Sequence, residues 1–481
     1  MTELAISLDT HSKIPLYQQI YDYIREEIRR RQILPGERLP SSRSLSSYLQ
    51  VSRSTVELAY EQLVSEGYLE SIPYRGYFAC EMEELYHIEG MQRESEAVRE
   101  EQKPEYRWDF AVSGIEPGGF PHNAWKKISK DVLNHADPEL FQLGDSQGEY
   151  GLREAIANYL HHARGVNCRP SQIVVGAGND YLLMLLSVIF GEKKTIAMEN
   201  PTYQSAFRCF QSLGHTICPV PLDEAGMDRK ALEASGAQIA YVMPAHQFPM
   251  GTVMPIKRRM ALLAWASREE DRYLLEDDYD SEFRYKGKPI PALQGFDQGQ
   301  RVIYLGTFSR AIAPSIRVSY MVLPDSLLPR YRQRGKNFSA TVSRTDQKIL
   351  ETFLRDGYFE RHLNRMRALY KSKHDLLLRQ LKAFQDICTV SGEHAGVHVL
   401  LKMNNGLCGE QAARLAAQAG IRVYCLKDYY IGETEARDDT VLIGYASMKE
   451  EEIPRACEKL LEVWKNPGEI SGRSSSVNQE A

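Results

Sequence analysis

The segment from Tyr304 to Tyr320, YLGTFSRAIAPSIRVSY, carries residue types that can bind a phosphate group. An apolar run leads into a small polar turn with Thr307 and Ser309, and Arg310 and Arg317 follow in the same segment. Hydroxyl and backbone N–H groups donate hydrogen bonds to phosphate oxygens, and a guanidinium adds a fixed positive charge. Surface loops with serine and arginine are just as common, so the turn alone is weak evidence for a phosphate site.

The same segment resembles the cofactor-lysine segment of aminotransferases of the aspartate-aminotransferase fold, in the form GTFSK…P…R…Y of MocR/GabR-type regulators. In that family the lysine after the second hydroxyl residue holds pyridoxal 5'-phosphate as a Schiff base, whereas this sequence has Arg310 there. The resemblance implies a cofactor pocket that includes Thr307, Ser309, Arg310 and Arg317.

Helical and strand-like patterns alternate from residue 108 onward, which predicts an α/β fold with a mainly parallel sheet. The apolar runs expected to form its strands are residues 173–175, 195–198, 239–243, 273–275, 302–305 and 319–323. Open sheets of this kind bind ligands at the ends of their strands. The resemblance implies an aminotransferase-like effector domain over 108–465, with a large domain to about residue 365 and a small domain over about 366–465.

The run EDDYDSEF, residues 276–283, is nearly the MocR-type signature itself. A carboxylate at the end of a buried strand is costly unless it meets a partner, and a protonated pyridine nitrogen is such a partner. The resemblance gives Asp277 this role and places Tyr279 near the phenolic oxygen of the cofactor ring. We expect the remaining acids of the run to be solvated or structural.

Other motifs of the aminotransferase pattern lie at further strand ends. GAGND, residues 176–180, opens an apolar helix, so Gly178 and Asn179 could hold a phosphate at the helix N-terminus. ENPTY resembles the loop whose aromatic ring stacks on the cofactor, which points to Tyr203, although a core tyrosine would give the same pattern. PAHQFPMG, residues 244–251, replaces the NPTG loop of the enzymes with the HQFP form of MocR-type proteins.

The small domain of the family carries an arginine that binds an effector carboxylate. Arg437 is the candidate here, although the surrounding loop GETEARDD matches the family poorly. Residues 466–481 are expected to be a disordered tail.

Residues 1–80 have the pattern of a helix-turn-helix followed by a hairpin. Residues 15–31 carry apolar side chains at helical spacing, and Ser41 or Ser42 and then Ser52 are expected to cap two further helices. The stretches PLYQQI, LPGERLPSSRSL, VSRSTVELAYEQLVSEGYL and RGYF closely resemble the GntR winged-helix domain. The resemblance implies binding to a double-stranded DNA operator through Arg43, Ser52, Arg53, Ser54, Thr55, Arg75 and Gly76.

The segment 81–107 is acidic and polar, and its composition predicts a linker without a core of its own. The net charge of −5 gives no overall attraction to nucleic acid, so DNA binding requires a local basic patch. The sequence has no apolar stretch long enough for a bilayer, no secretion signal and no C-x-x-C pair. We therefore expect a cytoplasmic protein with reduced thiols, no metal site and no membrane contact.

Arg310 decides which chemistry the pocket can support. Arginine stays protonated and has no free nucleophilic amine, so it cannot form the Schiff base or relay protons as the lysine does. Lys286 and Lys288 lie in a polar loop and are no obvious substitutes. Three alternatives remain: a substitution introduced into a lysine-bearing regulator, a natural variant that binds the cofactor non-covalently, or a pocket that binds another anion. The retained pocket residues favour non-covalent binding.

Two functions are compatible with this sequence. The first is a transcription regulator whose aminotransferase-like domain senses pyridoxal 5'-phosphate, an amino compound, or both. The second is an aminotransferase with an accessory DNA-binding domain, which Arg310 argues against, so we expect no catalytic residues. The resemblance further implies a homodimer, head-to-tail and domain-swapped, in which ligand binding re-spaces the two winged helices.

Overall fold

The computed structural model describes residues 6–10, 12–81, 105–134, 138–285, 290–393, 395–432 and 438–465. The described chain forms two units, the first ending at residue 81 and the second beginning at residue 105. Each has its own hydrophobic core. Most of the expected linker and all of the expected tail lie outside the described residues.

The first unit contains three helices around a small apolar core. The helices are α1 (Leu16–Arg29), α2 (Ser42–Leu49) and α3 (Arg53–Ser65). As expected, Ser41 caps α2 by accepting a hydrogen bond from the Ser44 amide, and Ser52 caps α3 by accepting one from the Thr55 amide. One face of α1 and α3 supplies the fully buried side chains of the core, among them Ile20, Ile24, Val56, Tyr60 and Leu63.

A hairpin follows the three helices and completes the winged helix. Strands β1 (Leu69–Ile72) and β2 (Gly76–Ala79) pair antiparallel. The preceding residues 37–39 pair with β2, because the Leu39 amide donates to the Tyr77 carbonyl and the Ala79 amide donates to the Glu37 carbonyl, each at 2.9 Å. Tyr74, at the tip, has a φ of +63° and a fully exposed side chain.

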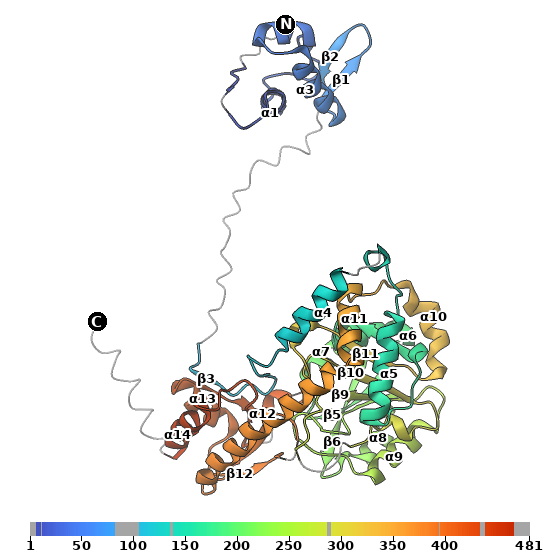
Figure 1. Ribbon diagram of the computed structural model, residues 1–481, viewed down its shortest axis with the longest axis vertical. Coiled ribbons are helices and arrows are strands. Elements are labelled where there is room, and N and C mark those ends of the chain that lie inside the picture. The colour runs from blue at the N-terminus through green and yellow to red at the C-terminus, as the bar shows by residue number, and fades with distance from the viewer. Residues whose placement is uncertain are drawn as a thin grey trace, which may run out of the picture. The chain divides into compact units, whose positions relative to one another are not determined.

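The second unit is built on an eight-stranded sheet (Figure 1). Its strands in spatial order are β4 (Ile173–Gly176), β11 (Ser319–Val322), β10 (Val302–Thr307), β9 (Tyr273–Asp278), β8 (Ile239–Val242), β5 (Thr195–Asn200), β6 (Thr216–Asp223) and β7 (Gly226–Met227). The pairs from β10 to β6 are parallel, whereas β11 and β7 run antiparallel to their neighbours. All six strands expected from apolar runs are present. β6 was missed because Pro219, Pro221 and several half-exposed positions interrupt its apolar pattern.

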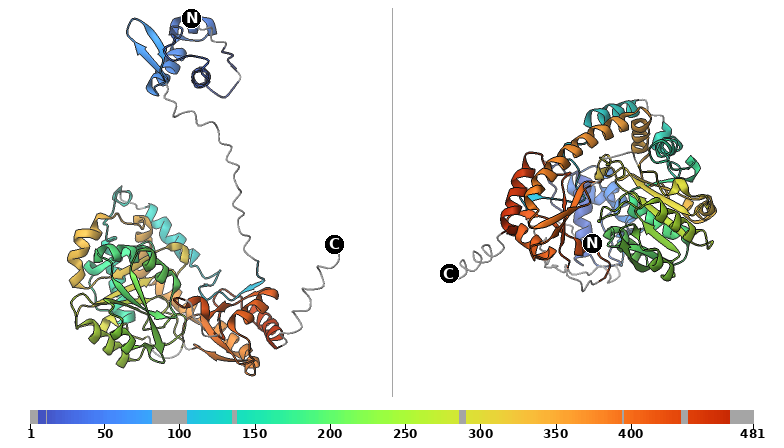
Figure 2. Two further views of the ribbon diagram at one scale, coloured as in Figure 1. Left: turned by 180° about the vertical axis from the view of Figure 1, so that it is seen from behind. Right: turned by 90° about the horizontal axis from the view of Figure 1, so that it is seen from below.

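Helices cover both faces of this sheet, as Figure 2 shows. One face packs against α6 (Asn179–Phe190), α7 (Gln204–Ser212) and α10 (Leu328–Arg334). The other packs against α5 (Tyr150–Arg164), α8 (Arg229–Ala234), α9 (Ile256–Ala266) and α11 (Arg344–Arg355), and α4 (His122–Asn134) lies on α11. Because successive strand side chains point to opposite faces, Leu275 joins the α6 side and Leu274 the α9 side.

A smaller lobe is joined to the large sheet by the long helix α12 (Tyr358–Leu381), orange in Figure 1. Its sheet contains β12 (Cys388–Ser391), β13 (His398–Met403), β16 (Thr440–Gly444) and β15 (Tyr424–Cys425), covered by α13 (Gly409–Gln418) and α14 (Glu452–Lys465). α12 runs without a break across residue 365, where the sequence places the domain boundary.

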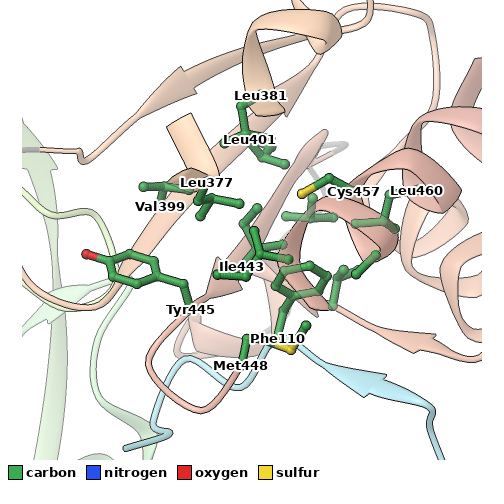
Figure 3. Packing of buried hydrophobic residues seen from close by; sticks show 14 of the residues in the cluster. Phe110, Leu377, Leu381, Val399, Leu401, Ile443, Tyr445, Met448, Cys457 and Leu460 are labelled. Atoms are coloured by element: carbon green, nitrogen blue, oxygen red, sulfur yellow. The ribbon is translucent and has the colours of Figure 1, made fainter. Parts of the chain in front are cut away.

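The first strand of the second unit belongs to the smaller lobe. β3 (Trp108–Asp109) pairs in parallel with β14 (Ile421–Arg422), and Phe110 is fully buried in the lobe's core (Figure 3). The Phe110 amide donates to the Arg422 carbonyl, and the Gly444 amide donates to the Phe110 carbonyl. The segment 110–114 therefore leaves the small-lobe core and runs toward the large sheet as a strap, a name we keep below.

Replacement of Phe110 by alanine should destabilise the second unit by about 3–5 kcal/mol, because it leaves a cavity in a packed core. Urea denaturation followed by circular dichroism measures the change. The matched control is Phe338→Ala, since the Phe338 side chain is 45% exposed. Equal losses for the two variants would contradict the assignment of Phe110 to the core.

Candidate functional site

Arg310 lies in the turn between β10 and β11, and its guanidinium bonds to the strap. One Nη donates to the Gly114 carbonyl and the other to the Val112 carbonyl, each at 3.0 Å. The guanidinium carbon lies 6.0 Å from the centroid of the Tyr279 ring. The side chain thus connects the predicted cofactor loop to a segment anchored in the small lobe.

Asp277, at the end of β9, points to the α6 side of the sheet and is 4% exposed. Its Oδ2 accepts a short hydrogen bond from the Tyr241 hydroxyl, whereas its buried Oδ1 has no partner among the described residues. Burial is the main reason that the pKa of Asp277 is raised to about 7, and the neighbouring Asp278 and Asp280 carboxylates add to the shift. An unpaired oxygen of this kind is suited to a positively charged N–H group.

Glu276 and Asp278 flank Asp277 and point to the opposite face. Glu276 accepts backbone hydrogen bonds from the Leu293 amide at 2.7 Å and the Gln294 amide at 2.9 Å. Asp278 accepts from Arg164 Nε at 2.8 Å and from the Tyr304 hydroxyl at 2.6 Å. Both residues are buried structural acids, as the sequence analysis allowed.

Tyr279, His246 and Asp280 form a hydrogen-bonded group beside Asp277. The Tyr279 hydroxyl and His246 Nδ1 are 2.9 Å apart, and the same nitrogen lies 2.9 Å from Asp280 Oδ2. The ring of Phe248 stands edge-on to Tyr279 and to Tyr203, with centroid distances of 5.9 and 6.0 Å. Tyr203 is 39% exposed, so it is not a core tyrosine.

The predicted phosphate-binding residues gather at the N-terminus of α6. Arg317 reaches it from the turn after β10, and its Nη2 lies 3.3 Å from Asp180 Oδ2. Gly178 has a φ of +96°, which favours glycine, and a Cβ there would lie 2.3 Å from Arg317 Nη2, so that any other residue would displace the arginine. Asn179 has a buried Oδ1 without a partner in the described chain.

The two hydroxyl residues of the turn are held by local hydrogen bonds. Thr307 Oγ1 accepts from Ser319 Oγ at 2.9 Å and from the Ser309 amide at 3.1 Å. Thr307 and Ser309 are each half-buried.

The donor and acceptor set fits pyridoxal 5'-phosphate. The unpaired Asp277 Oδ1 matches a pyridinium N–H, and the helix N-terminus with Arg317 matches a phosphate dianion. These two sets of groups therefore complement the two charged ends of this cofactor. Among the described residues there is no cluster of three or more His, Cys, Asp or Glu side chains suited to a metal ion.

Tyr241 and Asp280 were not singled out by the sequence analysis. Tyr241 lies in the apolar run IAYVM, where a core role is the natural expectation, and only its register opposite Leu275 brings it next to Asp277. Asp280 belongs to an acidic run in which the sequence does not distinguish buried from exposed members. Arg437, Lys286 and Lys288 lie outside the described residues.

In the first unit, the predicted DNA-contacting residues lie at the N-termini of α2 and α3 and at the hairpin tip. Arg43, Ser52, Arg53, Ser54 and Arg75 are exposed, and Thr55 and Gly76 are half-exposed. The Arg53 side chain pairs with Glu57 at 2.7 Å, and Ser52 Oγ lies within 2.8 Å of the Ser54 and Thr55 hydroxyls.

Arg38 was not predicted, yet its side chain lies against the hairpin. A Cβ at Gly76 would be 3.5 Å from Arg38 Nε. Its position results from the pairing of residues 37–39 with β2, which the sequence pattern does not indicate.

Fold and site together define a winged helix joined to a domain with the fold of pyridoxal-phosphate-dependent aminotransferases. Residues 16–78 match the bacterial regulatory proteins of the gntR family, and residues 113–460 match aminotransferase class I and II. An archaeal alanine:glyoxylate aminotransferase superimposes with a TM-score of 0.68 and 26% identity, covering 76% of this chain and 92% of that chain.

Regulators with the same two parts match over almost the whole length. The HTH-type transcriptional regulator YhdI of Bacillus subtilis is 39% identical, with 95% of this chain and 97% of the relative covered. The pyridoxine biosynthesis regulator PdxR of Corynebacterium glutamicum is 31% identical over 94% and 97%. The probable rhizopine catabolism regulatory protein MocR of Rhizobium meliloti is 29% identical over 92% of each. The chain belongs to the MocR-type, GntR-family transcriptional regulators with an aminotransferase-like domain. No helix in the described ranges is long and apolar enough to cross a membrane.

Replacement of Asp277 by asparagine should remove one component of the pH dependence of stability. A carboxyl whose pKa is raised from 3.8 to about 7 stabilises the folded state below about pH 4, and this contribution is lost as the pH rises to about 7. Between pH 5 and 8.5, wild type should lose roughly 2–3 kcal/mol relative to Asp277→Asn.

Urea denaturation of both proteins at pH 5, 6.5 and 8.5, without added pyridoxal phosphate, measures this difference. The other buried acids with raised pKa values, Glu199, Glu276 and Glu282, are unchanged in the variant and cancel in the comparison. A difference between the proteins that does not vary with pH would contradict the prediction.

Proposed function

We propose that this regulator senses pyridoxal 5'-phosphate, or an amino compound together with it, through non-covalent binding and without turnover. The main observation behind the proposal is that the Arg310 guanidinium is hydrogen-bonded to the backbone and is not a free amine. This guanidinium stands at the position that the family resemblance gives to the Schiff-base lysine, and it is engaged by two backbone carbonyls. A protonated guanidinium cannot act as the amine nucleophile, whereas the groups suited to the ring and the phosphate are retained.

Each end of the cofactor has residues to hold it. Asp277, oriented by Tyr241, would bind the ring nitrogen, and Tyr279 and Tyr203 would line the ring. The phosphate would be held by Thr307, Ser309, Arg317 and the backbone at Gly178 and Asn179. When bound, the cofactor supplies an aldehyde and an electron-withdrawing ring for amine chemistry. The alternative function is that of an aminotransferase. It would require a lysine for proton transfer, and this chain has Arg310 at that position.

The strap offers a route from this pocket to the small lobe. Arg310 binds the carbonyls of Val112 and Gly114, and the Phe110 carbonyl accepts a hydrogen bond from Gly444 on β16. A ligand that favours one position of the strap would therefore shift the small lobe, provided that it binds the two states with different affinity. In a head-to-tail, domain-swapped homodimer such a shift would change the spacing of the two winged helices.

The winged helix would bind an operator through Arg43, Ser52, Arg53, Ser54 and Thr55 at two helix N-termini and through Arg75 and Gly76 at the hairpin tip. Exposed arginines can reach phosphates or guanine edges, and hydroxyls at a helix N-terminus suit phosphate contacts. The effector carboxylate would be bound by Arg437, which lies outside the described residues.

Titration of the purified chain with pyridoxal phosphate should give a saturable absorbance change, and borohydride reduction should leave the intact mass unaltered. The variant Arg310→Lys should instead retain one pyridoxyl phosphate group after reduction, because the lysine supplies a nucleophilic amine. An adduct on the wild-type chain would show that another lysine reacts, and absence of any binding would refute the proposed sensor. Operator affinity is then measured with and without the cofactor. A change in affinity shows that the cofactor regulates DNA binding, whereas an unchanged affinity shows that the chain only binds the cofactor.

Replacement of Arg43 by alanine should weaken operator binding about tenfold, since one contact to a base or phosphate contributes about 1–3 kcal/mol. Fluorescence anisotropy with a fragment selected from genomic DNA provides the measurement at several salt concentrations. The control Arg30→Ala removes the same charge from the end of α1, where Arg30 pairs with Glu26. If both variants lose the same affinity, net charge rather than a specific contact explains the effect.

A further inference from the structure

The Tyr279 hydroxyl is held by two side chains that the proposed cofactor contacts do not include. His246 Nδ1 lies 2.9 Å from the hydroxyl oxygen and 2.9 Å from Asp280 Oδ2. His246 and Asp280 are 3% and 2% exposed, whereas Tyr279 is half-buried. Tyr279 packs against the α6-side core, to which Tyr241, the partner of Asp277, also belongs. The buried pair therefore holds a tyrosine that lies on the same side of the sheet as Asp277.

The contacts of His246 define which of its ring nitrogens carries a hydrogen. An ionised carboxylate can only accept hydrogen bonds, so the Nδ1 atom next to Asp280 must be a donor. The same N–H group faces the Tyr279 oxygen, which can accept a hydrogen bond from it. Burial raises the pKa of Tyr279 well above its usual value, and the Asp280 carboxylate adds to this shift, so the phenol keeps its own proton. With the imidazole as donor, the Tyr279 O–H group is available to donate to a ligand.

Other contacts fix the ring of Tyr279 but not the direction of its hydroxyl. The Phe248 ring stands edge-on at a centroid distance of 5.9 Å, and the guanidinium carbon of Arg310 lies 6.0 Å from the ring centroid. Phe248 has no polar atom in its side chain, and the two Nη atoms of Arg310 donate to the strap carbonyls. The hydrogen bonding of the hydroxyl therefore depends on His246 and Asp280.

The small lobe covers the His246–Asp280 pair. Gly396, just before β13, has a φ of +73°, and a Cβ there would lie 2.2 Å from His246 Cε1 and 2.9 Å from Asp280 Oδ2. The Tyr445 hydroxyl holds this glycine by donating to its carbonyl at 2.8 Å. The ring of His398, on β13, lies 5.8 Å from the ring of His246. The missing side chain at residue 396 thus leaves room for the imidazole in the orientation that faces both oxygens.

We propose that His246 and Asp280 are positioning residues for the cofactor, an inference that rests on the proposed function. Asp280 orients the imidazole of His246, and His246 holds the Tyr279 oxygen, so that the Tyr279 hydroxyl donates to the phenolic oxygen of pyridoxal phosphate. Because both residues are almost fully buried, they act through Tyr279 and do not touch the cofactor. Their effect on cofactor affinity is therefore lost when the Tyr279 hydroxyl is removed.

A double-mutant cycle on pyridoxal phosphate affinity tests this role. Absorbance titration of the full-length chain gives the dissociation constant for wild type, His246→Leu, Tyr279→Phe and the variant with both changes. We expect His246→Leu to weaken binding about fivefold, because a buried hydrogen bond is lost, and to have no further effect in the Tyr279→Phe background. His246→Asn keeps an N–H donor close to the position of Nδ1 and should restore most of the affinity.

The matched control is His215→Leu, which removes another buried histidine. His215 bonds to Ser187 and to the Lys194 amide near the start of β6, whereas the predicted cofactor residues lie at the other ends of the strands. His215→Leu should therefore leave the affinity unchanged. An equal loss in His215→Leu and His246→Leu would assign the effect to general destabilisation and overturn the proposal.

Asp280→Asn covers the case in which His246→Leu does not fold, as judged by circular dichroism. Its loss of affinity should likewise vanish in the Tyr279→Phe background. The proposal is overturned if the losses from residues 246 or 280 add to the loss from Tyr279→Phe, or if every variant binds as tightly as wild type. In both cases the cofactor sensor itself still stands. A wild-type chain that does not bind pyridoxal phosphate refutes the proposed function, and the positioning role with it.

Discussion

The end of strand β9 buries three consecutive carboxyl groups, and the large domain is arranged to give each of them a partner. Glu276 accepts hydrogen bonds from two backbone amides, and Asp278 accepts them from Arg164 and Tyr304. Asp277, on the other face of the sheet, accepts one from Tyr241. A buried carboxylate without partners would cost several kcal/mol, so these contacts fix the positions of α5, β8 and β10 around β9. Among the described residues, one oxygen of Asp277 and one of Asp278 remain without a hydrogen-bond partner, and they lie on opposite faces of the sheet.

Successive side chains of β9 point to opposite faces of the sheet, so the two faces carry different groups. The α6 side carries Asp277, the N-terminus of α6 and Arg317, and these groups complement a ligand with a basic ring and a phosphate. On the α5 side, Arg164 and Asp278 form a buried ion pair in which Arg164 Nε lies 2.8 Å from Asp278 Oδ2.

Arg310 holds the turn after β10 by hydrogen bonds to the strap. The family resemblance leads one to expect a lysine here, which would instead form a covalent bond to the cofactor. A lysine bonded to a cofactor would leave the carbonyls of Val112 and Gly114 to other donors. The guanidinium fork instead satisfies both carbonyls and ties the turn after β10 to the strap of the small lobe. Arginine suits this role because its charge is permanent and its two Nη groups can bind two acceptors at once.

Sequence alone determined the winged helix and the six apolar strands, because both depend on local patterns: helix caps and short apolar runs. The residues around the cofactor stay a prediction, which rests on the resemblance of motifs at strand ends to those of a known family. The sequence could not identify Tyr241, Asp280 or Arg38 as neighbours of the sites, nor decide which acids of residues 276–282 are buried. Strand register and the packing of distant helices decide those questions, since they bring together side chains that no local pattern relates. The bonds of Arg310 to Val112 and Gly114, nearly 200 residues earlier in the chain, likewise exist only in the tertiary structure.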